Sequence, residues 1–213
     1  TVIAVTSGKG GTGKTSITGG VAASLALMGH RVLCIDMDIG LRNLDITLGL
    51  SDRALMDFSD VALGRCPLGR GAVDHPDVKG LSLLTAPMSL SPSLTIDKVR
   101  AMLDTARGQY DYILIDSPAG LGAGFRLAIC GADRALVIAT NDASSLRDAQ
   151  RTVCELESIR QVHLIMNRIQ PKLLRKLRAT IDDAMNTAGL PLIGVVPEDD
   201  QVMLAANLGQ PLT

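Results

Sequence analysis

Short apolar runs recur along the chain, and each is closed by polar residues or glycine. The seven runs are 1–8, 31–38, 81–87, 110–118, 134–141, 162–168 and 192–199. Their apolar residues are continuous rather than alternating, which is the pattern of strands covered on both faces of a sheet. Stretches with helical spacing lie between them, at 14–29, 95–107, 144–159 and 171–188. Strands that alternate with helices predict an α/β fold, a doubly wound and mostly parallel sheet of about seven strands flanked by helices.

The length and composition favour one domain over 1–213. A chain of 213 residues with 46% hydrophobic residues can bury a large core. Aromatic residues make up only 2%, so stacking platforms for single-stranded nucleic acid are nearly absent. The formal net charge of −1 provides no overall field that would attract DNA or a membrane surface.

The four cysteines form no CxxC pair, and Cys34 lies inside the apolar run "RVLCID". We expect reduced thiols, mostly packed as small hydrophobic residues. With no signal peptide in the sequence, this favours a cytoplasmic protein. No apolar run approaches the roughly 18 residues of a membrane span.

The stretch "GKGGTGKT" follows the first predicted strand and opens a helix, which is the context that supports the phosphate-binding motif G-x-x-x-x-G-K-[ST]. Its glycines let the backbone wrap a phosphate, and the N–H groups at the helix start supply donors. Lys14 would reach the β- and γ-phosphates, and the Thr15 hydroxyl would ligate Mg²⁺. The residues expected to bind the nucleotide here are Gly8, Gly10, Gly11, Thr12, Gly13, Lys14, Thr15 and Ser16.

This loop also contains a second lysine, Lys9, on the far side of the glycines. Lys9 cannot enter the same cradle from the helix side. A phosphate held by Lys14 gains from a second cation only where that cation can reach it. Two chains face to face, with Lys9 of each directed at the partner's nucleotide, would achieve this; the alternative is a solvated lysine on a loop.

Carboxylates follow two further strands. Asp36 and Asp38 end the second strand, and Asp116 ends the strand "YILID". Because ligands bind at the carboxyl ends of strands in open α/β sheets, we expect all three beside the phosphate loop. Carboxylates there suit a magnesium shell and the positioning of an attacking water, with Asp38 the better placed for water.

Two later strands end on residues that suit a base. Asn167 carries both a donor and an acceptor and could read a purine edge, and Arg168 could lie flat on the base. Pro197, Glu198 and Asp199 would line the other side. A plain turn at each strand end is the alternative.

Together these blocks resemble the MinD branch of the MinD/ParA family of ATPases over nearly the whole chain. The blocks most specific to that branch are "DIGLRNLD" (38–45) and "DSPAG" (116–120), and "SSLRDA" (144–149) and "VVPEDD" (195–200) agree in place and order.

The resemblance implies ATP or ADP with Mg²⁺, and an ATP-bound homodimer in which Lys9 is a signature lysine that reaches the partner's phosphates. It implies that Lys9, Lys14 and Asp38 act in hydrolysis, with Asp38 activating water. Metal-shell positions would be Thr15, Asp36 and Asp116, and the adenine end would be Asn167, Arg168 and 197–199. It also implies slow hydrolysis until an activator binds, in a switch that places the division-septum inhibitor in bacterial cell division.

The same resemblance places a docking face for a MinE-like activator or a MinC-like inhibitor on one helix, at Ser144, Ser145, Arg147 and Asp148. Two features depart from the family. Its usual Pro-Glu pair is replaced by Asn141-Asp142, and the sequence ends at Thr213, before the family's C-terminal amphipathic helix. We therefore expect membrane contact only through a segment of that kind.

The basic stretch 171–185 resembles a membrane helix only superficially. Its stripe of Leu173, Leu177, Ile181 and Met185 is expected to be the buried face of a helix on the sheet, with Lys172, Arg175, Lys176 and Arg178 in solvent.

Three other functions stay open. A ParA-like ATPase that positions DNA or other cargo would need a basic patch, which would give binding a steep salt dependence. A redox ATPase like the nitrogenase iron protein would need exposed cysteines in glycine-rich loops, and Cys130 is the only near fit. The last is a degenerate relative that binds ATP and acts only as a docking module.

Overall fold

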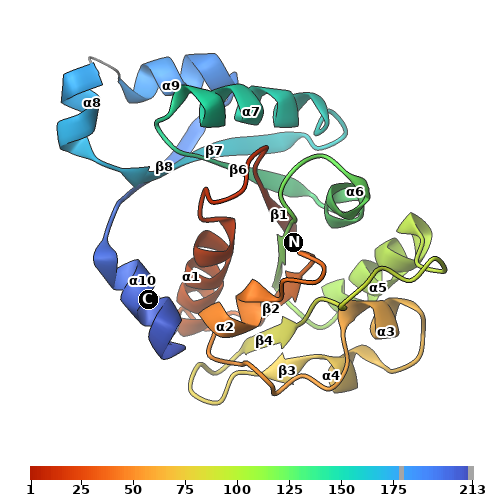
Figure 1. Ribbon diagram of the computed structural model, residues 1–213. Helices are drawn as coiled ribbons and strands as arrows, with labels where there is room; N and C mark the ends of the chain where they lie inside the picture. Colours follow the sequence, from red (N-terminus) through yellow and green to blue (C-terminus); the bar gives the residue numbers. More distant parts are fainter. Residues whose placement is uncertain (178–179, 211–213) are drawn as a thin grey trace.

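The computed structural model describes residues 1–177 and 180–210, and its strands form one sheet with helices on both faces (Figure 1). The strands are β1 (Val2–Thr6), β2 (Val32–Asp36), β3 (Val73–Asp74), β4 (Leu81–Leu84), β5 (Tyr112–Asp116), β6 (Arg134–Ala139), β7 (Gln161–Ile169) and β8 (Leu192–Pro197). Their order in the sheet is β3-β4-β2-β5-β1-β6-β7-β8. The prediction of a doubly wound α/β sheet is confirmed.

All seven predicted strands are present and run parallel. The eighth, β3, is antiparallel to β4 and only two residues long, so it left no apolar run in the sequence. β2, β4 and β5 are buried almost throughout, as continuous apolar runs require, whereas the edge strand β8 alternates between half-buried and exposed residues. β1 lies between β5 and β6, which brings the loop after β1 beside the end of β5.

The helices occupy both faces of the sheet. They are α1 (Lys14–Leu27), α2 (Asn43–Thr47), α3 (Phe58–Ala62), α4 (Leu68–Gly71), α5 (Ile96–Arg107), α6 (Ala123–Ile129), α7 (Ala143–Cys154), α8 (Pro171–Leu177), α9 (Ile181–Ala188) and α10 (Asp200–Leu208). α1 packs on the face that carries Cys34 and Leu114, and α5 packs on the opposite face with Ile35 and Ile115. The predicted helices at 14–29, 95–107 and 144–159 are confirmed within a few residues. The short helices left too little periodicity to predict.

The prediction of one helix over 171–188 is wrong, because α8 and α9 are separate helices. α9 begins with a capping box in which the Thr180 hydroxyl accepts from the Asp183 N–H at 3.1 Å and the Asp183 carboxylate accepts from the Thr180 N–H at 2.8 Å. Such a box starts a new helix rather than continuing one.

The break changes which residues of this segment are buried. Ile181 and Met185 pack against the core as predicted, but Leu173 is 37% exposed and Leu174 packs in its place. Lys172, Arg175 and Lys176 are exposed, as expected. Arg178 and the side chain of Leu177 lie outside what the structure describes.

The four cysteines are free thiols, and Cys34 lies in the core while Cys130 packs against it. Cys34 is fully buried, Cys66 and Cys130 are half-buried, and Cys154 is exposed. Within 1–177 and 180–210, no helix has the length and apolar character needed to cross a bilayer.

Candidate nucleotide-binding site

The loop between β1 and α1 has a backbone that only glycine adopts easily. Gly11 and Gly13 have φ values of 77° and 89°, in the left-handed region. A Cβ at Gly13 would overlap the Asn167 amide nitrogen, and one at Gly8 would overlap the Asp148 carbonyl. Glycine is therefore required by conformation at Gly11, by space at Gly8 and by both at Gly13, and the predicted phosphate loop has the shape that its motif demands.

Lys14 lies at the first position of α1 with its side chain directed inward. It is 8% exposed, and its ammonium donates to Ser7 Oγ at 3.1 Å. Burial lowers the pKa of Lys14, against the opposing effect of Asp116 and Asp38 nearby. An ammonium has three N–H donors. This buried cation at the start of a helix can therefore gain a phosphate as a further partner.

Thr15 and Asp116 meet where a magnesium ion is expected. The Thr15 hydroxyl donates to Asp116 Oδ2 at 2.6 Å, whereas the buried Asp116 Oδ1 has no hydrogen-bond partner among the described residues. Burial, and next the neighbouring Asp36, raise the pKa of Asp116 to about 7, although Thr15 and Lys14 act in the opposite direction. A cation would satisfy the orphaned oxygen and favour the carboxylate, so these residues fit Mg²⁺.

No group of three or more Asp, Glu, His or Cys side chains in the described ranges is placed to hold a metal by itself. A magnesium ion here would need phosphate oxygens and water to complete its shell, which is how Mg²⁺ binds in nucleotide sites.

The two carboxylates after β2 differ in environment. Asp36 is fully buried, and its two oxygens accept the N–H groups of Asp38 at 2.8 Å and Leu44 at 3.2 Å. Burial raises the pKa of Asp36 to about 6. Asp36 thus holds the loop that carries Asp38, and its place in a magnesium shell stays a prediction. Asp38 is half-buried and close enough to Lys14 to interact electrostatically, and its role with water stays a prediction.

Asn167 and Arg168, at the end of β7, both contact the phosphate loop. The Asn167 side-chain amide donates to the Thr12 carbonyl at 2.8 Å, and an Arg168 guanidinium nitrogen donates to the Gly11 carbonyl at 3.3 Å. One N–H of the Asn167 amide is thereby used by the loop, which leaves its second N–H and its carbonyl oxygen to pair with a base. Arg168 also pairs with Glu198 at 3.5 Å, so it bridges the loop and the end of β8.

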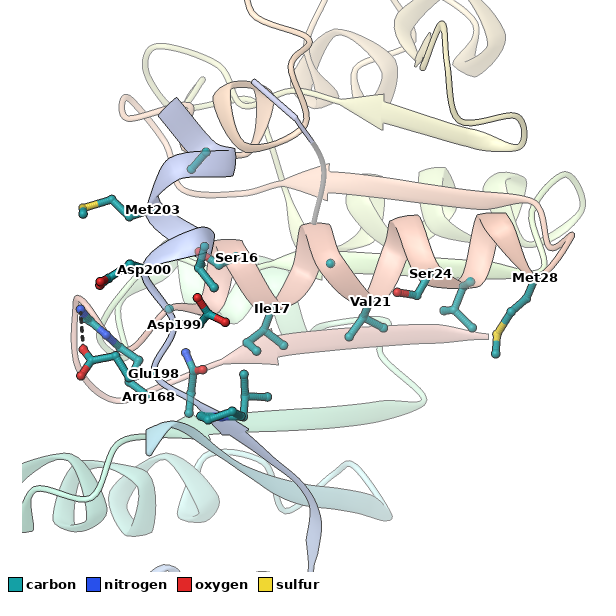
Figure 2. Close-up of a pocket in the computed structure, with 18 residues that line it drawn as sticks. Ser16, Ile17, Val21, Ser24, Met28, Arg168, Glu198, Asp199, Asp200 and Met203 are labelled. Atoms are coloured by element: carbon teal, nitrogen blue, oxygen red, sulfur yellow. Dashed lines mark ion pairs between the residues drawn. The ribbon is translucent and has the colours of Figure 1, made fainter. Parts of the chain in front are cut away.

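A cavity of about 700 Å³ opens beside the phosphate loop, between α1, the end of β8 and α10 (Figure 2). The residues that were predicted to bind the nucleotide and that line it are Gly13, Ser16, Asn167, Arg168, Pro197, Glu198 and Asp199. The structure therefore brings the predicted adenine end and the phosphate loop to one hollow large enough for a nucleoside.

The apolar stripe that predicted α1 borders this cavity as well as the core, because Ile17, Val21 and Leu25 are partly buried against core residues. Ile17, Val21, Leu25 and Met28 all border it, and Met28 is 76% exposed. Figure 2 shows Ile17, Val21 and Met28 on the same side of the helix. The buried side of α1 consists mostly of small residues, Thr18, Gly19, Ala22, Ala23 and Ala26, which let the helix approach the sheet closely.

Lys9 lies outside the cradle. Its ammonium is 3.3 Å from Asp142 Oδ1 and donates to Ser144 Oγ at 2.8 Å, and its side chain is 46% exposed. Lys9 is thus not a free solvated lysine, because its ammonium is paired within its own chain. Instead it bridges the loop to the start of α7.

The predicted docking residues on α7 divide into two groups. Ser144 and Arg147 are exposed and Asp148 is half-buried. Ser145 is 2% exposed, because its hydroxyl accepts the Thr140 N–H and its own N–H donates to Asp142. Ser145 is therefore a structural residue of the helix start, and its prediction as part of a docking face is wrong.

Two residues of the site were not predicted to belong to it. Ser7 joins Lys14 to the loop, and Asp142 holds Lys9. Ser7 directly precedes the quoted motif, but nothing in its spacing indicates a hydroxyl that contacts two lysines. Asp142 was visible only as a departure from the family pattern.

Cys130 cannot support a cluster at this site. It ends α6, on the connection that enters β6 at the amino edge of the sheet, opposite the phosphate loop. Its thiol contacts the Ile96 carbonyl at 3.9 Å. The hypothesis of a redox ATPase therefore loses Cys130, the only cysteine that nearly fitted it.

The site consists of a strand followed by a glycine loop with a buried lysine, and an aspartate from the neighbouring strand accepts a hydrogen bond from the threonine that follows this lysine. This arrangement defines a P-loop nucleotide-binding protein of the α/β class. Residues 3–212 match the family model "CobQ/CobB/MinD/ParA nucleotide binding domain", and the chain belongs to that family.

Several relatives and solved structures share the full architecture. The chain is 41% identical over 222 residues to the septum site-determining protein MinD of Helicobacter pylori, covering 99% of this chain and 83% of that protein. It is similar to a structure of the MinC:MinD cell division protein complex of Aquifex aeolicus, with a TM-score of 0.91, 39% identity and coverage of 99% and 86%. MinD of Pyrococcus horikoshii complexed with Mg-ADP has a TM-score of 0.85, 28% identity and coverage of 99% and 86%.

Proposed function

We propose that this chain is a MinD-type ATPase, an ATP-dependent dimerisation switch that acts in placing the septum of a dividing bacterial cell. The observation that carries the proposal is the contrast between the two lysines of one loop. Lys14 is buried at the helix start, where its own nucleotide would bind, and Lys9 is exposed on the outer side. A second, outward cation on a phosphate loop is explained by a phosphate on another molecule.

The residues of this chain divide the work of hydrolysis. The backbone N–H groups of the loop and Lys14 would bind the phosphates, and Thr15 with Asp116 would hold the magnesium ion. When bound, Mg²⁺ neutralises charge on the β- and γ-phosphates. Asp38, half-buried at the end of its loop, would orient the attacking water. Positioning and charge stabilisation, rather than a covalent intermediate, provide the rate enhancement.

The proposed partners follow from the relatives. A solved structure of Aquifex aeolicus MinD is a complex with MinC, and we propose a MinC-like inhibitor as a partner of this chain at the exposed residues Ser144 and Arg147. A MinE-like activator and a second copy of the chain complete the proposal.

We also propose a cytoplasmic location with peripheral membrane association, tested by co-sedimentation with liposomes in ATP against ADP.

The different roles proposed for the two lysines are tested by comparing Lys9→Ala with Lys14→Ala. Lys14→Ala is expected to lose nucleotide binding, and Lys9→Ala is expected to bind ATP yet stay monomeric in size-exclusion chromatography with Mg-ATP and lose dimer-dependent turnover. A stable ATP dimer with stimulated turnover in Lys9→Ala would contradict the role given to Lys9.

The ParA-like alternative has less support. A ParA family ATPase from Chlorobium tepidum has a TM-score of 0.82 but only 22% identity, which shows the shared fold alone. DNA binding measured against salt concentration separates the alternatives, because phosphate contacts give a steep salt slope.

A further inference from the structure

The hydroxyl of Ser7 connects the two lysines of the phosphate loop. Ser7 Oγ donates to the Lys9 carbonyl at 2.6 Å and accepts from the Lys14 ammonium at 3.1 Å. Ser7 is fully buried, so its bond with Lys14 is shielded from water, and its bond with the Lys9 carbonyl is partly shielded.

The direction of these two bonds follows from chemistry. An ammonium can only donate, so the Ser7 lone pair must face Lys14, and the single hydroxyl proton is then free for the Lys9 carbonyl. Hydrogen bonds in a chain polarise one another, so a hydroxyl that accepts from a cation is also a stronger donor. The charge on Lys14 thus strengthens the bond that holds the backbone of Lys9.

Lys9 is held at both ends within its chain. Ser7 binds its backbone carbonyl, and Asp142 with Ser144 binds its ammonium. The ammonium of Lys9 is exposed and can exchange its partners, whereas the Ser7 hydroxyl that holds the Lys9 carbonyl is buried. The Lys9 ammonium can therefore change its partner while the Lys9 backbone stays in place.

We propose that Ser7 is a positioning residue that couples the nucleotide-binding Lys14 to the position of Lys9, and so to the joining of two copies. This inference rests on the proposed function. Ser7 touches no phosphate in the proposal. It acts by fixing where the Lys9 side chain starts, so that the ammonium can reach a neighbouring copy's nucleotide.

The test compares Ser7→Ala, Ser7→Thr, Lys9→Ala and the double variant Ser7→Ala/Lys9→Ala. ADP affinity is measured by fluorescence, and the dimer fraction in Mg-ATP is measured by analytical ultracentrifugation. The matched control is Ser82→Ala, another buried serine, bonded to Asp74 in the outer part of the sheet. It reports the general cost of losing a buried hydroxyl.

Loss of the Ser7 hydroxyl, and with it both of its hydrogen bonds, is expected to weaken dimerisation about two- to tenfold, with a smaller loss of ADP affinity. Ser7→Thr, which keeps the hydroxyl, is expected to restore the dimer. The double variant is compared with Lys9→Ala at protein concentrations high enough for residual dimer to form. Ser7→Ala is expected to add no further loss there, because both changes act through the same side chain.

Three results would overturn the inference: an equal loss of ADP affinity in Ser7→Ala, an additive effect in the double variant, or a Ser82→Ala effect as large as that of Ser7→Ala. Failure of the proposed function is distinguishable, because it would appear as normal ATP-dependent dimerisation in Lys9→Ala itself. If Lys9→Ala stays monomeric while Ser7→Ala dimerises normally, only the role of Ser7 is excluded.

Discussion

Lys9 forms an ion pair with Asp142 of its own chain, at 3.3 Å between Nζ and Oδ1. Asp142 is also the N-cap of α7, where its carboxylate accepts from the Ser145 N–H at 3.0 Å. Hydrogen bonds from Ser144 and Thr140, and a weaker one from Lys9, hold the pKa of Asp142 well below its usual range. The lysine proposed to act on a partner is thus bound to an ionised carboxylate in the single chain.

Asp142→Asn is expected to favour the ATP-bound dimer, because Lys9 no longer has to leave a carboxylate. The pair is about half exposed, so the gain should be modest, about two- to fivefold in dimer affinity. Asparagine caps helices as well as aspartate does, so α7 should keep its stability. Sedimentation in Mg-ATP measures the effect.

Asp142→Ala is the matched variant, since it removes the cap as well as the charge. It should lower the free energy of unfolding by about 1 kcal/mol, whereas Asp142→Asn should not. A weaker dimer in Asp142→Asn would show instead that Asp142 binds the partner in the joined state.

Asp116→Asn is expected to stabilise the nucleotide-free protein above pH 7. The folded pKa of Asp116, about 7, lies above its ordinary value of 3.8, so the folded state binds more protons between these pH values. Stability from this group is therefore present at low pH and lost as pH rises through 7. Because the amide of Asp116→Asn does not ionise, the variant avoids that loss. Its free energy of unfolding should exceed that of the unmodified protein by on the order of 3 kcal/mol at pH 8, and by less at pH 5.

Thermal unfolding in EDTA at pH 5 and pH 8 provides this measurement. A stabilisation that is as large at pH 5 as at pH 8 would contradict the explanation by charge burial. The same variant should lose magnesium-dependent nucleotide binding, which is the usual conflict between stability and function at a buried site.

Gly13→Ala is expected to disrupt the phosphate loop. Its φ of 89° is strained for alanine, by roughly 1–3 kcal/mol, and the new Cβ would overlap the Asn167 amide. Gly29→Ala is the control, because Gly29 has a φ of 94° but no atom near its added Cβ. Both variants should lose stability, and only Gly13→Ala should also lose ADP binding. Equal effects on binding would contradict the steric argument.

Arg147→Glu is expected to weaken binding of a MinC-like partner about tenfold while ATP hydrolysis without a partner is retained, since a reversed charge on an interface typically costs more than 1 kcal/mol. Arg160→Glu, an exposed position beyond the end of α7, is the control. Equal binding by both variants would exclude this part of α7 as the docking face.

Much of the site was predictable because the sequence patterns that indicate it involve residues close together in the chain. The motif from Gly8 to Thr15 needs glycines at fixed spacing for a backbone shape that belongs to the loop itself. Asp116 was predictable because a carboxylate directly after an apolar strand must lie at the binding edge of a parallel sheet. Ser145 was predicted to lie on a docking face, but its side chain is buried. The exposure of a serine in the first turn of a helix depends on whether its hydroxyl bonds the preceding strand end, as that of Ser145 does with the Thr140 N–H.

The apolar stripe of α1 shows the limit of periodicity. The spacing of Ile17, Val21 and Met28 established a helix but did not show what its apolar side faces. The core side is made of alanine, glycine and threonine, which carry little hydrophobic signal, and the larger residues border the cavity. The break between α8 and α9 was missed for a related reason, since the capping box at Thr180 interrupts a stripe that continues in the sequence.

The sequence by itself determined the class of fold, the phosphate loop and the carboxylates around it, because the alternation of strands and helices along the chain and short-range spacing constrain these. Only the tertiary structure decided where the second lysine lies and what holds it. The contacts of Lys9 with Asp142 and Ser144, and that of Asn167 with Thr12, join residues more than 130 positions apart. Such contacts depend on how β1, β6 and β7 pair in the sheet, and no local pattern contains that information.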